Sequence, residues 1–115
     1  MSIEKTPQGA EDLLGKAANL AQLVAYQMGA VVSRTIIDKK SGTLTLFAFD
    51  AGQGLSEHTA PFDAFVQIID GNAAITISGE NFHLKQGEMI VMPAGQPHSL
   101  KALEKFKMML VMIRS

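Results

Sequence analysis

The sequence predicts an all-β barrel or jelly roll, and three observations support this fold class. Short apolar runs with strand-like alternation recur along the 115-residue chain. Turns that contain Gly or Pro separate these runs at intervals of roughly 8–12 residues, as in barrels and sandwiches. Apolar residues make up 47% of the chain, which indicates a barrel that is buried inside and, over part of its outer surface, against a second subunit.

The chain is expected to form one domain, with an N-terminal tail and short helix over residues 1–20 and the barrel over residues 21–115. Residues 1–9 are polar, whereas the apolar residues of 11–20 follow an approximately helical spacing. Residues 23–26 and 30–37 are then rich in strand-forming residues, and the first hairpin turn is expected at 38–42.

The remaining strands follow in the same way. Residues 43–50 and 73–77 alternate between apolar and polar side chains, and residues 65–69 form a dense apolar run. The Asp-Gly-Asn sequence at 70–72 is typical of a tight turn between two strands. Further strands are expected at 82–84, 89–92, 98–103 and 107–113.

Composition excludes several classes of function. A net charge of −1 provides no basic surface for nucleic acid, and no segment approaches the ~20 apolar residues that cross a membrane. The polar N-terminus lacks the apolar core of a signal peptide, so we expect a cytoplasmic protein. The chain has no Cys, so a bound metal would be held by nitrogen or oxygen, or weakly by Met sulfur.

Two motifs mark the second half of the chain. Residues 52–71 read G-x5-H-x-A-x3-A-x6-G, and residues 87–98 read G-x5-P-x-G-x2-H. With His at position 60 and Glu at position 64, these would be the two signature motifs of the cupin family. The chain therefore resembles a small single-domain cupin over residues 42–113, and this resemblance implies a jelly-roll barrel.

The resemblance also implies where a metal would bind. Cupins hold Mn, Fe, Ni or Zn with three His and one carboxylate, and here His58 and His98 match the first and the last His. Ala60 and Ala64 occupy the other two ligand positions and cannot bind a metal. The candidates for a third protein ligand are Glu57, Asp63 and Gln67. Alternation from Ala64 points Val66 and Ile68 inward and Gln67 away, unless a bulge reverses it.

Two functions remain open from the sequence. The first is binding of a small molecule in the barrel, with His58 and His98 pointing inward. The predicted lining of that site is His58, Ala60, Ala64, Val66, Gln67 and His98. The second is a metal-dependent enzyme, dioxygenase- or isomerase-like, with His58 and His98 as residual ligands. A divalent metal cofactor and no cofactor at all are both open, and no catalytic residue is identified.

The last strand is apolar on both of its faces. By alternation, Met108, Leu110 and Met112 share one face, and Met109, Val111 and Ile113 share the other. The methionines are interpreted as adaptable core residues. Because the segments at 23–26 and 30–37 add further apolar surface, we expect a homodimer.

Overall fold

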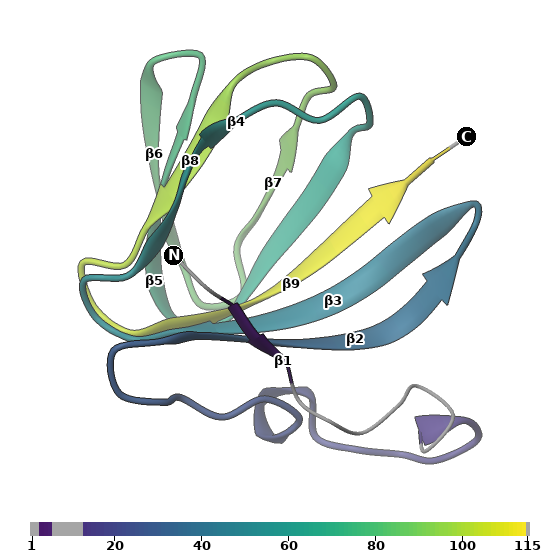
Figure 1. Ribbon diagram of the computed structural model, residues 1–115. Helices are drawn as coiled ribbons and strands as arrows, with labels where there is room; N and C mark the ends of the chain where they lie inside the picture. Colours follow the sequence, from purple (N-terminus) through teal and green to yellow (C-terminus); the bar gives the residue numbers. More distant parts are fainter. Residues whose placement is uncertain (1–2, 6–12, 115) are drawn as a thin grey trace.

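The computed structural model describes residues 3–5 and 13–114, and its regular secondary structure there is almost entirely β-strand (Figure 1). Its elements are β1 (Ile3–Lys5), a short 3₁₀ helix η2 (Leu20–Gln22), β2 (Val31–Lys39), β3 (Gly42–Phe49), β4 (Gly54–His58), β5 (Ala64–Ile77), β6 (Glu80–Lys85), β7 (Met89–Met92), β8 (His98–Lys101) and β9 (Phe106–Ile113). No helix in the described part of the chain is long and apolar enough to span a membrane. The predicted all-β barrel is thus confirmed.

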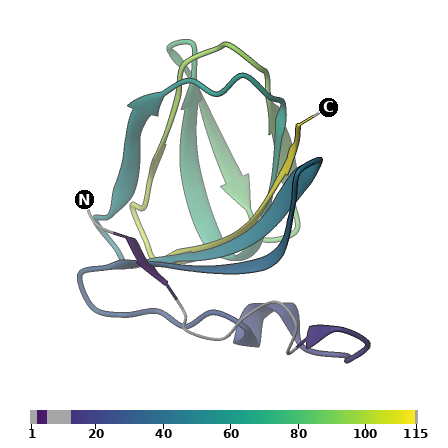
Figure 2. The same ribbon diagram turned by 45° about the vertical axis from the view of Figure 1, so that its right-hand side comes forward.

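Two sheets share the long strand β5. Its first half pairs with β9 and β7, so that the first sheet has the order β1-β2-β3-β9-β5-β7. Its second half pairs with β6 and β8, and β8 in turn pairs with β4 to complete the second sheet. The two sheets face each other across the interior (Figure 2).

The expected turn at residues 70–72 is wrong, because β5 runs through it as one strand of 14 residues. Its pairing with β9 shifts register between Ile68 and Asp70, which marks a β-bulge. Such a bulge bends the strand and carries it from one sheet into the other. Gly71 adopts a φ of +74°, and a Cβ there would collide with the carbonyl oxygen of Lys105. The Asp-Gly-Asn signal therefore comes from a bulge that needs Gly, not from a turn.

The core fills the space between the two sheets. Phe49 and Phe106 are fully buried and stack with their ring centroids 4.5 Å apart. Inward residues of β5 alternate as predicted up to the bulge, where Ala64, Val66 and Ile68 are buried, and the parity then changes to Ala73, Ile75 and Ile77. The bulge therefore keeps apolar side chains inside on both halves of the strand.

The segment from Leu13 to Ala30, which we call the N-terminal arm, lies against the outer face of the first sheet (Figure 1). The helix expected at 11–20 is not seen over residues 13–20, which hold one isolated turn, and residues 11 and 12 lie outside the described part. The short helix is instead the 3₁₀ turn of η2. The strand expected at 23–26 is also wrong, since these residues form no strand.

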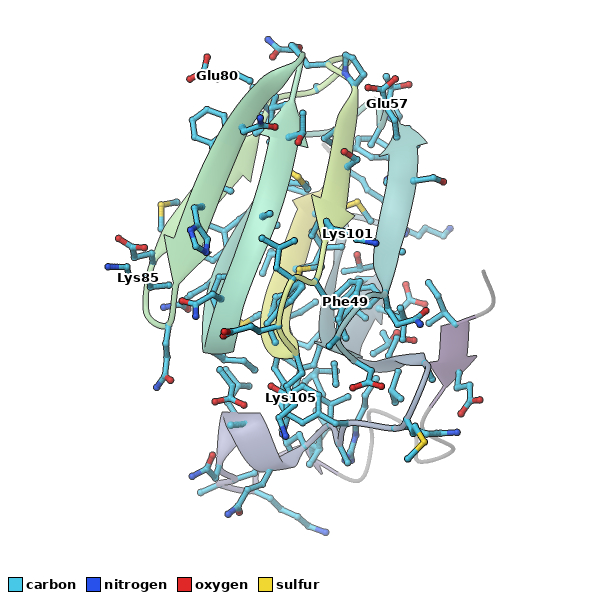
Figure 3. All side chains as sticks on the ribbon, turned by 90° about the vertical axis from the view of Figure 1, so that its left-hand side faces the viewer. Phe49, Glu57, Glu80, Lys85, Lys101 and Lys105 are labelled. Carbon is cyan, nitrogen blue, oxygen red and sulfur yellow. The ribbon has the colours of Figure 1, made fainter. Side chains whose placement is uncertain are left out.

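Several contacts fasten this arm. The Tyr26 hydroxyl donates to Asp70 Oδ2 at 2.6 Å, and Lys107 Nζ donates to the Ala21 carbonyl at 2.6 Å. Lys105 Nζ and Lys107 Nζ each lie 4.9 Å from the centroid of the Tyr26 ring, and Figure 3 shows Lys105 beside the arm. Val24 on the arm packs with Val32, Leu46 and their neighbours as a second apolar cluster. The chain itself thus covers the apolar surface that these N-terminal segments add.

Candidate functional site

Two histidines meet where β4 ends and β8 begins. His58 and His98 are direct cross-strand partners, and their rings lie 4.4 Å apart at an angle of 70°. His58 Nδ1 lies 2.7 Å from the Ser56 carbonyl oxygen, and His98 Nδ1 lies 3.3 Å from that of Gln96. A carbonyl oxygen only accepts, so each of these bonds requires a proton on Nδ1. The two Nε2 atoms then point at each other, 3.1 Å apart.

This arrangement disfavours protonation of His98. In the neutral tautomers just described, both Nε2 atoms are acceptors, so that two lone pairs face each other. His98 is 4% exposed. Burial, and next the charge of His58, lower the pKa of His98, with a smaller opposing effect of the Gln96 carbonyl. The pair is therefore ready to accept a hydrogen bond or a cation at a single point between its two Nε2 atoms.

The histidines border a cavity of about 280 Å³ between the sheets. Apart from them its lining is apolar, and it consists of Phe47, Leu55, Ala60, Ala64, Met92, Leu100, Met108, Leu110 and Met112. His98 is buried in this wall, whereas His58 is exposed and lies at its rim. A mostly apolar cavity with a few convergent polar groups is the usual form of a small-molecule site.

The structure brings together four of the six residues predicted to line a ligand site: His58, Ala60, Ala64 and His98. Val66 points inward as expected, but it is fully buried in the core and does not line the cavity. Gln67 points away, as alternation predicted, and it is paired with Met89 and Met109. Neither Val66 nor Gln67 is therefore placed to contact a ligand in this cavity.

The two Nε2 atoms also permit a geometric test for a metal. Metal–nitrogen bonds of about 2.0–2.1 Å to atoms 3.1 Å apart enclose an angle of roughly 98°, which suits two neighbouring ligands of one ion. Within residues 3–5 and 13–114, however, no three His, Asp or Glu side chains form a metal-binding group. The residues fit a weak two-imidazole site and do not fit the four-ligand site of a complete cupin motif.

The three proposed replacement ligands do not line the cavity either. Asp63 Oδ1 accepts a hydrogen bond from the Ala94 backbone N–H at 2.8 Å. Glu57 is exposed and lies at the upper end of β4 (Figure 3). Gln67 is on the opposite face of the first sheet, so none of the three completes the ligand set.

Sequence reasoning underestimated the methionines. Met108, Leu110 and Met112 do share one face, as predicted, but that face borders the cavity and is more than core filling. Ala64 pairs with both Met92 and Met112, so these three residues form one row across the cavity wall. The signal for a ligand cavity was the presence of small residues, Ala60 and Ala64, at two ligand positions beside flexible Met side chains. Met adapts its shape to a neighbour.

Comparison with known proteins places this geometry in a family. The model of the family described as "Cupin domain" matches residues 45–114, which is more than half of the chain. A conserved protein of unknown function from Streptococcus pyogenes, SPY1581, is 40% identical, with a TM-score of 0.84 over 88% of this chain and 89% of that one. A cupin 2 conserved barrel domain protein from Leptotrichia buccalis is 38% identical, with a TM-score of 0.82 over 84% of this chain and 47% of that one.

A further similarity comes from a protein with a named role. The tetracenomycin polyketide synthase protein TcmJ of Streptomyces glaucescens is 26% identical over 73 residues. The match covers 63% of this chain and 49% of TcmJ, so the chain spans about half the length of that relative.

Proposed function

The chain belongs to the cupin family, and from this premise we propose that its barrel binds a small organic molecule whose polar group is oriented by His58 and His98. The observation that carries the proposal is the cavity: its wall is apolar except for these two imidazoles. Ala60 and Ala64 supply space where a complete motif would supply an imidazole and a carboxylate.

The chemistry of the pair narrows the ligand class. Both Nδ1 atoms face backbone carbonyls, so Nε2 is the atom that each ring presents to a ligand. Neutral Nε2 atoms accept hydrogen bonds. A ligand with an apolar or aromatic body and a phenol or enol hydroxyl would satisfy both the wall and the pair. The similarity to TcmJ, which is named as a polyketide synthase protein, is consistent with an organic ligand.

A second function, a metal-dependent dioxygenase- or isomerase-like enzyme, is favoured by the separation of the Nε2 atoms. His58 and His98 would hold Mn, Fe, Ni or Zn, which would act as a Lewis acid on an oxygen of the substrate. The metal content of the purified protein tests this alternative, beside the His58→Ala/His98→Ala double variant. Near-stoichiometric metal that disappears in the double variant would favour the enzyme. No metal after loading with these ions would exclude it.

Ligand binding is tested with 2-naphthol as a probe and naphthalene as its match without a hydroxyl. We expect 2-naphthol to bind more tightly, as measured by calorimetry or by shifts of backbone amide signals in NMR. Ala64→Leu should abolish binding because its side chain enters the cavity, whereas Ala74→Leu, an outward position on the same strand, should not. Equal loss in both variants, or no loss in Ala64→Leu, would contradict the proposal.

The pair itself is tested by His58→Ala. This variant should prefer 2-naphthol over naphthalene less strongly than the wild type, because only His98 Nε2 remains to accept a hydrogen bond from the hydroxyl. A variant that still prefers 2-naphthol as strongly as the wild type would show that His58 does not orient the ligand.

The cytoplasmic location expected from the sequence remains a prediction.

A further inference from the structure

A tight turn at residues 93–96, which we call the rim turn, joins β7 to β8 and leads into His98. The Gln96 N–H donates to the Pro93 carbonyl at 3.3 Å, and Gly95 has a φ of +77°. These features are typical of a type II turn, whose third residue is most often Gly. The rim turn and the loop between β4 and β5 both run across the upper end of the barrel (Figure 1).

The loop between β4 and β5, residues 59–63, holds the rim turn through two hydrogen bonds. The Gly95 N–H donates to the Ala60 carbonyl at 2.8 Å, and the Ala94 N–H donates to Asp63 Oδ1 at 2.8 Å. The first bond joins two backbone groups, whereas the second depends on one exposed side chain. A hydrogen bond to a carboxylate is roughly twice as strong as one between neutral groups. Asp63 is therefore the side chain that fastens the rim turn.

The rim turn matters because it supplies the carbonyl that sets the tautomer of His98. His98 Nδ1 lies 3.3 Å from the Gln96 carbonyl oxygen, which is long for a hydrogen bond, whereas His58 Nδ1 lies 2.7 Å from that of Ser56. If the Gln96 carbonyl moves away, the proton of neutral His98 can reside on Nε2 instead. This Nε2–H would donate to His58 Nε2, which lies 3.1 Å away. The pair would then satisfy itself and offer the ligand no Nε2 acceptor.

We propose that Asp63 is a positioning residue of the ligand site, which holds the rim turn so that both imidazole Nε2 atoms stay free to accept a hydrogen bond. Asp63 does not line the cavity, so it acts through the turn and not on the ligand. The role of the Nε2 atoms rests on the proposed function. The effect of Asp63 on His98, however, exists in the free protein and can be measured there.

Other hydrogen bonds next to the rim turn limit the size of the expected effect. Ser78 Oγ donates to Gln96 Oε1 at 3.2 Å, and the Ser78 N–H donates to the Pro97 carbonyl at 2.8 Å. These bonds hold the end of the turn that enters β8, but neither reaches Ala94. Loss of the Asp63 carboxylate should therefore shift the population of His98 tautomers and leave the barrel folded.

Nitrogen NMR of the imidazole rings in the free protein tests this role. At about pH 8, above the usual histidine pKa of ~6.5, protonated and unprotonated ring nitrogens have well separated shifts. The wild type should carry the His98 proton on Nδ1, whereas Asp63→Ala and Asp63→Leu should carry a measurable fraction on Nε2. Asp63→Asn keeps an oxygen acceptor for the Ala94 N–H and should retain the wild-type tautomer. His83, exposed on β6, serves as the internal reference.

Glu88→Ala is the matched control. Glu88 Oε1 accepts a hydrogen bond from the Lys85 N–H at 2.7 Å, so this variant loses the same kind of bond at the turn between β6 and β7. It should leave His98 unchanged, and thermal unfolding verifies the fold of every variant. A wild type with the His98 proton on Nε2 would overturn the proposal, as would an unchanged tautomer in either folded variant that lacks the acceptor. An equal change in Asp63→Asn or Glu88→Ala would also overturn it, and so would unfolding of both Asp63→Ala and Asp63→Leu.

Calorimetry connects the tautomer to binding. Asp63→Ala should bind 2-naphthol about 2- to 10-fold more weakly than the wild type, which corresponds to one neutral hydrogen bond. It should bind naphthalene with unchanged affinity, because the cavity wall is intact. An equal loss for both probes would mean that the cavity itself is distorted and would refute the positioning role. A wild type without preference for 2-naphthol would contradict the proposed function instead, and the tautomer of His98 would then decide the role of Asp63 alone.

Discussion

Gly71 connects the two halves of β5, and its replacement by Ala tests the description of the bulge. Two separate costs are expected at this position. Its φ of +74° is unfavourable for any residue with a Cβ. The added Cβ would also collide with the Lys105 carbonyl oxygen and lie 3.1 Å from both Cα and Cβ of Phe106. Because these are backbone atoms and the root of a buried side chain, the neighbouring strand would have to move.

Gly79 separates the two costs. It has a similar φ of +81°, but nothing lies within 4 Å of a Cβ built there. Gly79→Ala should lose about 1–2 kcal/mol of stability, because a residue with a Cβ disfavours the left-handed conformation. It should regain about 0.4–1 kcal/mol, because Ala makes the unfolded chain stiffer. Gly71→Ala should lose the same net stability as Gly79→Ala and, in addition, about 1–3 kcal/mol from overpacking. The difference between the two variants, about 1–3 kcal/mol, is therefore the cost of the collision.

Urea unfolding followed by circular dichroism measures both free energies, and thermal unfolding should show Gly71→Ala melting well below Gly79→Ala. At about 4 °C per kcal/mol for a chain of this size, the gap is roughly 4–12 °C. If Gly71→Ala is no less stable than Gly79→Ala, then Gly71 is not packed against β9. The bulge could then not be the reason for the glycine.

Three further predictions concern the histidines and the arm. Because burial and His58 lower the pKa of His98 from the usual 6.5, the folded chain binds fewer protons than the unfolded chain below that pH. The free energy of unfolding should thus fall as pH drops below about 6.5, and less so in His98→Gln; equal pH dependence by urea unfolding would contradict this. His98→Ala should lose about 1–3 kcal/mol because the residue is buried, and His58→Ala no more than about 0.5 kcal/mol because it is exposed. Equal losses in urea would show that His58 is a core residue. Tyr26→Phe keeps the ring beside both lysines but removes the bond to Asp70, and should cost about 1 kcal/mol, with faster proteolysis of the arm. Unchanged stability and cleavage would show that this bond does not hold the arm.

The sequence predicted the barrel well because alternation and turn residues report on local structure. It failed at residues 70–72, because a Gly with positive φ occurs in a bulge as well as in a turn. Only the pairing with the neighbouring strand distinguishes the two structures. It also failed at residues 23–26, where Val24 is buried against the sheet and Leu23 and Tyr26 are partly buried, but none of them joins the sheet. Burial of an apolar segment is visible in a sequence, whereas the hydrogen-bonding partner that makes it a strand is not.

For the site, motif spacing singled out His58, Ala60, Ala64 and His98, and these four residues border one cavity. Motif spacing could not show that the two Nε2 atoms face each other, since that depends on the Ser56 and Gln96 carbonyls that fix the rings. Motif spacing also could not show that Val66 lies in the core and not in the cavity lining. Alternation gives the face of a strand but not the depth at which the cavity ends and the core begins.

The cavity lining and the outward side chains of the first sheet lie back to back on the same strands. On β9, Leu110 and Met112 line the cavity, whereas Val111 between them faces outward. On β5, Ala64 faces inward next to the outward Phe65. Because side chains alternate strictly along a strand, one substitution can alter either face without touching the other. Ala64→Leu should therefore block the cavity, whereas Val91→Lys, at an exposed position on β7, should leave the affinity for 2-naphthol unchanged in calorimetry. Loss of 2-naphthol binding in a folded Val91→Lys variant would mean that the strand backbone itself moves and couples the two faces.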